Sequence, residues 1–63
     1  MSAATLPAPA ALSRKDAAAK YSISVWTVDE LIAAGMVSAK RVGRRVLVDA
    51  QSMKDWYDGL DDA

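Results

Sequence analysis

The residues best suited to binding chemistry lie in one short stretch, residues 40–48, which reads Lys-Arg-Val-Gly-Arg-Arg-Val-Leu-Val. Two β-prone runs meet at a glycine there, which is the pattern of a short β-hairpin. Cations near a hairpin tip are free to pair with an anion such as a phosphate group. The stretch therefore predicts an anion-binding hairpin, which we call the basic hairpin, and its cations are Lys40, Arg41, Arg44 and Arg45.

Two loop lengths are compatible with the basic hairpin. A two-residue loop of Gly43 and Arg44 places Val42 opposite Arg45, which mixes apolar and charged side chains on one face. A loop that is one residue longer places Val42 opposite Val46 and keeps apolar side chains together. Three-residue loops more often carry their glycine late than first. We nevertheless expect the three-residue loop because of its apolar pairing.

Three short helices are expected around the hairpin, each behind a residue whose side-chain oxygen can accept a hydrogen bond from the first backbone N–H groups. Only three residues separate the first two helices, which suits a helix-turn-helix. Gly35 stands where a positive φ commonly ends a helix. The helices are expected at residues 14–21 after Ser13, residues 25–34 after Ser24, and residues 50–60 after Asp49.

Apolar residues at helical spacing predict the core. Trp26 lies away from the apolar stripe of its helix, so we expect it to be exposed, whereas Trp56 belongs to a stripe and is expected in the core. The predicted core positions are Ala17, Ala18, Tyr21, Val28, Leu31, Ile32, Met53, Trp56, Tyr57 and Leu60.

Length and composition limit the classes of function. A chain of 63 residues has room for one core, and it contains no cysteine and no histidine. Disulfides, thiolate chemistry and the usual zinc sites are therefore excluded. The carboxylates are not paired with a base or a nucleophile in the pattern of an active site. We expect no catalytic residue, no metal and no cofactor.

The chain has no net charge, but its charges are divided along the sequence. Residues 14–45 hold seven cations and three anions, whereas residues 46–63 hold one cation and five anions. A basic body can approach a polyanion while the acidic end is repelled. The same asymmetry would allow copies of the chain to associate head to tail.

The first twelve residues differ in composition from the rest. They are rich in alanine and include Pro7 and Pro9, so residues 1–12 are expected to form a flexible arm. They lack the cationic start and apolar run of a signal peptide, and no segment is apolar enough to span a membrane. We expect a cytoplasmic protein with its folded domain at residues 13–60 and an acidic tail at residues 61–63.

The expected helices and hairpin carry a set of residues in a particular order. Two alanines lie in the first helix. A serine precedes the second helix, which carries Thr-Val in its first turn and Leu-Ile in the turn before the glycine that follows it. The run Arg-Val-Gly-Arg-Arg and a Met/Trp pair come later. These are Ala17, Ala18, Ser24, Thr27, Val28, Leu31, Ile32, Gly35, residues 41–45, Met53 and Trp56. In this order and spacing, residues 13–60 resemble the excisionase-like, MerR-type winged helix-turn-helix domains of phage excisionases (recombination directionality factors) and related small regulators.

The resemblance implies a mainly α fold with a small β-hairpin: a helix-turn-helix, a two-stranded wing and a C-terminal helix. In this family the second helix enters the major groove of double-stranded DNA and the wing follows the backbone or the minor groove. An excisionase binds tandem sites near an attachment site in the bacterial host cell, bends the DNA and directs a tyrosine- or serine-type integrase towards excision. The residues that the resemblance assigns to DNA contact are Ser24, Val25, Trp26, Thr27, Glu30, Lys40, Arg41, Gly43, Arg44 and Arg45.

The second helix departs from the family pattern. It carries Asp29 and Glu30 where family members commonly have arginine. Glutamate can accept a hydrogen bond from a cytosine amine, and Ser24, Trp26 and Thr27 can contact thymine methyl groups. We expect limited specificity from a single copy, for which several copies bound side by side would compensate.

Two other functions are compatible with the same residues. A small MerR-like transcriptional regulator would use the same fold and the same DNA contacts. A protein-interaction adaptor would instead dock its basic hairpin on an acidic partner, and it would show no salt-dependent affinity for DNA.

Overall fold

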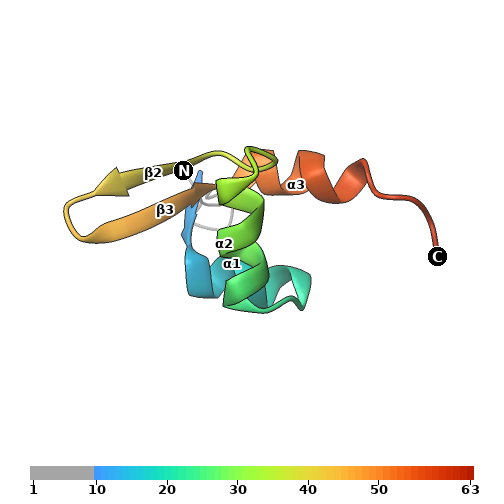
Figure 1. Cartoon of the computed structure of the whole chain (residues 1–63), viewed down its shortest axis with the longest axis horizontal. Coiled ribbons are helices and arrows are strands. Elements are labelled where there is room, and N and C mark those ends of the chain that lie inside the picture. The colour runs from blue at the N-terminus through green and yellow to red at the C-terminus, as the bar shows by residue number, and fades with distance from the viewer. Residues whose placement is uncertain (1–9) are drawn as a thin grey trace, which may run out of the picture.

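The computed structural model describes residues 10–63, which form three helices and a three-stranded antiparallel sheet. Figure 1 shows the β2–β3 hairpin projecting to one side of the helices and α3 leading to the C-terminus on the other. The protein is thus a small mixed α/β structure, with more sheet than the sequence suggests. In chain order the elements are β1 (Ala11–Ser13), α1 (Arg14–Tyr21), α2 (Val25–Ala33), β2 (Ala39–Val42), β3 (Arg45–Asp49) and α3 (Ala50–Asp58).

The three helices begin where the sequence predicts. Ser13 Oγ accepts a hydrogen bond from the Asp16 N–H at 3.0 Å, and Ser24 Oγ accepts one from the Thr27 N–H at 3.0 Å. The Asp49 carboxylate does the same for the first turn of α3. These caps satisfy backbone donors that have no partner within the helix. The helix α1 also ends as predicted, whereas α2 ends one residue early and α3 two residues early.

Left-handed residues end α1 and α2. Gly35 has φ +76° and closes α2, as the sequence predicts. Ser22 adopts the same conformation after α1, with φ 58°, and the next amide, Ile23 N–H, donates to the Ala18 carbonyl at 3.0 Å. That backbone bond belongs to a Schellman ending, which turns the chain sharply between the two helices. The sharp turn lets α2 pack against α1 after a connection of only three residues.

The strand β1 differs from the expected flexible arm. Ala11 and Leu12, which the sequence assigns to the arm, pair with the end of β3, so that Leu12 lies opposite Val48. Leu12 packs against the core, and this apolar contact holds β1 on the sheet. A three-residue strand is too short to show an alternating pattern, so the sequence does not reveal it. The rest of the expected arm, residues 1–9, lies outside the described residues.

The predicted register of the basic hairpin is wrong. Val42 lies opposite Arg45, so the loop contains only Gly43 and Arg44. Gly43 has φ +61°, and a glycine at the first loop position is typical of a tight type II′ turn, whose twist matches the strands. The apolar pairing that favoured the longer loop brings little stability here, because Val42 is 57% exposed near the tip.

The core lies where the helices meet the inner face of the sheet, and its fully buried members come from α1, α2, β3 and α3. Trp56 packs edge-on against Tyr21 at its border, with a ring-centroid distance of 6.3 Å. The expectation that the whole apolar stripe of α3 is covered is wrong, because Tyr57 and Leu60 are exposed. The buried residues are Ala17, Ala18, Val28, Leu31, Val37, Val48 and Met53.

Candidate functional site

A shallow groove of about 490 Å³ lies between the helices and the basic hairpin. The N-terminal turn of α1 forms one wall, the first residue of α2 contributes a second part, and the hairpin turn with the start of β3 completes it. We call it the basic groove. Its lining residues are Ser13, Arg14, Lys15, Val25, Arg44, Arg45 and Val46.

The basic groove has a strongly positive lining. Four of its seven lining residues are cationic and none of the seven is an acid. Both α1 and α2 begin at this groove, and the start of a helix carries a partial positive charge from its unpaired N–H groups. These two sources of positive potential act on the same volume. The groove is therefore suited to the phosphate groups of an extended polyanion.

An ion pair joins the two helices beside the groove. Arg14 Nη1 donates to both carboxylate oxygens of Asp29, at 3.0 Å each. Arg14 lines the groove, so the pair places the acid of α2 next to a cation of α1. Asp29 is one of the two acids that depart from the family pattern. Its charge is neutralised locally, which reduces the repulsion that the sequence suggests.

The predicted residues of α2 divide into two groups. Ser24 Oγ and Thr27 Oγ1 are hydrogen-bonded to each other at 2.9 Å, and Ser24 also caps the helix, so part of their bonding capacity is used internally. Val25, Trp26 and Glu30 are exposed, and Trp26 shows 68% of its surface. The predicted exposure of Trp26 is confirmed. Of these five residues, Val25 alone lines the basic groove.

The predicted DNA-contact residues of the hairpin do not all lie at the basic groove. Arg44 and Arg45 line the basic groove, and Gly43 forms the turn that carries them. Arg41 lies opposite Val46, so these two side chains leave the same face of the hairpin, and Val46 is part of the groove lining. Arg45 lies opposite Val42, so its side chain leaves β3 on the face opposite to Val46, and Arg45 borders the groove from the hairpin tip. The structure therefore brings Arg44 and Arg45 to the groove at the start of α2, with Arg41 on the strand beside them.

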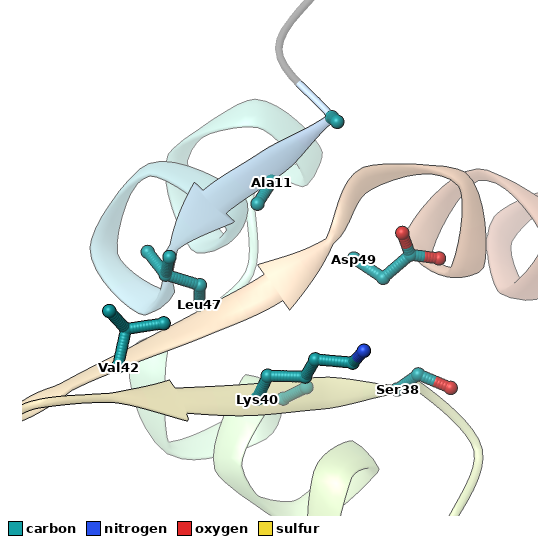
Figure 2. A pocket seen from close by; sticks show the side chains of 8 residues that line it. Ala11, Ser38, Lys40, Val42, Leu47 and Asp49 are labelled. Atoms are coloured by element: carbon teal, nitrogen blue, oxygen red, sulfur yellow. The ribbon is translucent and has the colours of Figure 1, made fainter.

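Lys40 lies on the other face of the sheet. It is opposite Leu47, and Figure 2 shows its side chain running along β2 towards Ser38, away from the hairpin turn. A second, mainly apolar depression of about 460 Å³ lies on this face. We call the surface the outer sheet face, and the residues labelled on it in Figure 2 are Ala11, Ser38, Lys40, Val42, Leu47 and Asp49.

Sequence reasoning missed the contribution of α1 to the groove. The sequence pattern predicts Ser13 as a helix cap and does not place Arg14 and Lys15 beside the hairpin. A signal was present, because the first turn of a helix favours acids and disfavours cations. Two successive cations directly after a cap oppose the helix dipole, and such a pattern indicates that the charges serve another purpose.

No family model matches the chain, and no curated protein and no solved structure matches it either. Within residues 10–63, no helix is long and apolar enough to cross a membrane. The same part of the chain contains no group of three or more His, Cys, Asp or Glu side chains placed to hold a metal ion. The geometry and charge of the basic groove are therefore the features that point to a function.

Proposed function

We propose that this protein is a winged helix-turn-helix protein that binds double-stranded DNA through the basic groove. In this proposal α2 is the helix that enters the major groove, and the basic hairpin is the wing that follows the backbone. The observation that carries the proposal is the meeting of Arg44 and Arg45 with the starts of α1 and α2 in one groove without an acid. A phosphate backbone is the ligand that fits such a line of cations.

Phosphate contacts position the protein, and exposed residues of α2 supply the sequence preference. Val25 lines the groove and Trp26 is the next residue of α2; both present exposed apolar surface, which suits the methyl group of thymine. Glu30 is exposed on the same helix and can accept a hydrogen bond from a cytosine amine. The hydroxyl groups of Ser24 and Thr27 serve the helix cap first, so their contribution to base recognition is secondary.

Within DNA binding, the role we propose is that of an excisionase. Residues 13–60 resemble that family, and the chain's opposite charges suit head-to-tail association of copies on tandem sites. Bound near an attachment site, the protein bends DNA and directs a tyrosine- or serine-type integrase towards excision, in the cytoplasm of a bacterial host. A small transcriptional regulator would use the same contacts, and an excision assay run beside a promoter-reporter assay separates the two.

The test of DNA binding is a salt series measured by fluorescence anisotropy with a labelled duplex. We expect a steep dependence of affinity on salt, and Arg44→Ala/Arg45→Ala should reduce the slope by about two units because each lost phosphate contact removes about one. The matched control is Lys20→Ala/Lys54→Ala, which removes the same charge from residues that lie together outside the basic groove. An equal effect of both double variants would mean that only net charge matters. Negligible binding of the native protein at low salt would favour the adaptor function.

The head-to-tail proposal has its own test. Analytical ultracentrifugation on duplexes with one, two or three candidate sites should show cooperative loading, which weakens when Asp61 and Asp62 are replaced by asparagine. Independent loading of each site by the native protein would contradict head-to-tail association and leave DNA binding unaffected.

A further inference from the structure

The Arg14–Asp29 ion pair assigns roles to two residues that the resemblance leaves without one. Arg14 lines the basic groove, and Asp29 holds one nitrogen of its guanidinium through two contacts of 3.0 Å. On the basis of the proposed function, we propose that Arg14 contacts a DNA phosphate. Asp29 is then a positioning residue that holds the Arg14 guanidinium at the groove.

The geometry leaves Arg14 able to bind a second anion. A guanidinium group carries five N–H donors, and both contacts with Asp29 use Nη1. The donors on Nε and Nη2 have no hydrogen-bond acceptor within the described residues. The side chains of Arg14 and Asp29 are 45% and 44% exposed, so an incoming phosphate can reach the guanidinium without displacing the carboxylate.

The pair also explains why an acid is compatible with a DNA-facing helix. A free arginine must lose its rotational freedom when it binds a phosphate, which weakens the interaction. Asp29 orders the Arg14 side chain before DNA arrives, and the guanidinium at the same time compensates the negative charge of the carboxylate. Glu30 is the neighbouring acid of α2, is exposed, and forms no ion pair within the described residues. On a duplex without a preferred site, where binding is mainly electrostatic and base contacts contribute little, Glu30 is a matched control for the charge of Asp29.

The two roles of Asp29 predict changes of opposite sign. If Asp29 only repels phosphates, Asp29→Asn strengthens DNA binding, as Glu30→Gln should. If Asp29 positions Arg14, Asp29→Asn weakens binding although it removes a negative charge. We expect the dissociation constant for Asp29→Asn to rise about three- to tenfold, with a salt slope lower by about one unit. On the same non-specific duplex, Glu30→Gln should lower the dissociation constant, because it removes only a negative charge.

Arg14→Gln supplies the second half of the test. In this background Asp29 has nothing to position, so adding Asp29→Asn should improve binding instead of weakening it. The salt slope distinguishes a lost phosphate contact from a loss of folded protein. A smaller folded fraction weakens binding equally at every salt concentration and therefore leaves the slope unchanged. Circular dichroism measures the folded fraction of each variant directly.

Two outcomes overturn the inference. Stronger binding by Asp29→Asn in the native background, with Arg44→Ala/Arg45→Ala still defective, contradicts the positioning role and leaves the DNA-binding proposal standing. Weaker binding at an unchanged slope in Asp29→Asn also contradicts it, because the loss is then structural. If the native protein binds no duplex at low salt, it is the proposed function that fails.

Discussion

Ser22 carries backbone strain that the fold requires. It is the one non-glycine residue among residues 10–63 with a positive φ, and it lies at the turn between α1 and α2. A residue with a Cβ atom pays about 1–2 kcal/mol for this conformation. Its side chain is exposed, so the backbone alone selects the conformation.

Ser22→Gly should therefore stabilise the protein. We expect an increase of about 1 kcal/mol in the free energy of unfolding, which corresponds to roughly 4–8 °C in a domain of this size. Ser22→Ala is the control, because it removes the hydroxyl and keeps the strained Cβ. A chemical-denaturation series on the three proteins measures the difference, and equal stability of the glycine and alanine variants would rule out strain as the cause.

Lys54 is the residue whose protonation responds to the fold. Its ammonium group donates a hydrogen bond to Asp58 at 2.6 Å, and this bond together with the nearby negative charge raises the pKa of Lys54 above its ordinary value of 10.5. A raised pKa in the folded state means that the pair stabilises the protein fully below pH 10.5. The contribution is lost as the pH rises through the folded pKa.

An NMR titration of the Lys54 side chain checks this assignment. The native protein should titrate above 10.5, and Asp58→Asn should lower the midpoint because it removes the hydrogen-bond acceptor and the charge together. The effect on stability should be small, since both side chains are more than half exposed and water screens the pair. A midpoint that is the same in the two proteins would show that the pair does not persist in solution.

At the scale of elements, local chemistry was predictable and long-range pairing was not. The three caps depend on one side chain and the next few residues, so Ser13, Ser24 and Asp49 could be identified directly. The strand β1 depends on the contact of Leu12 with the core, which no local pattern encodes. The register of the basic hairpin is set by its turn, where Gly43 favours a two-residue loop, whereas apolar pairing of Val42 with Val46 predicts the wrong register.

The candidate site likewise contains residues that the sequence predicts and residues that only the tertiary structure brings in. Arg44 and Arg45 could be predicted, because cations beside a turn glycine are visible in the sequence. Lys40 and Arg45 leave the same face of the hairpin, but Arg45 lies at the tip and borders the basic groove, whereas Lys40 lies further along the outer sheet face and does not line it. Arg14 and Lys15 join the groove only after α1 has packed beside the hairpin, so their role depends on tertiary structure.

The turn of the basic hairpin can be tested through Gly43. Gly43→Ala keeps open space around the new Cβ and changes only the backbone preference, at a cost of about 1–2 kcal/mol. We expect faster amide exchange in β2 and at the tip of β3, with α1 and α2 still protected. Gly59→Ala is the control, since Gly59 has φ −85° and accepts a Cβ in ordinary contact. Equal exchange in both variants would contradict the strained turn.

The contribution of β1 can be tested through Leu12. Its side chain is half-buried against the core, so Leu12→Ala should lower the free energy of unfolding by about 2 kcal/mol. Leu60→Ala, at an exposed position of the same residue type, should change it by less than about 0.5 kcal/mol. Thermal unfolding of the two variants distinguishes a strand that belongs to the fold from a segment that merely precedes it.

In the molecule as a whole, the basic hairpin and the acidic C-terminal end lie on opposite sides (Figure 1). The basic hairpin projects from one side of the helices, and the C-terminal end, with Asp58, Asp61 and Asp62, lies on the other. The side of the protein that carries the basic groove would therefore attract a DNA duplex. The acidic C-terminal end would lie far from the phosphates of a duplex bound there. This separation gives a chain without net charge one strongly positive side, which the proposed DNA binding requires.

The most direct test of the basic groove as the DNA-binding surface is NMR mapping with 15N-labelled protein and an unlabelled duplex. We expect the largest amide shifts at Ser13, Lys15, Val25, Arg44 and Arg45, with small changes at Ala11 and Leu47 on the outer sheet face and at the acidic C-terminus. Shifts concentrated on the outer sheet face, or no shifts at low salt with excess duplex, would contradict DNA binding at the basic groove.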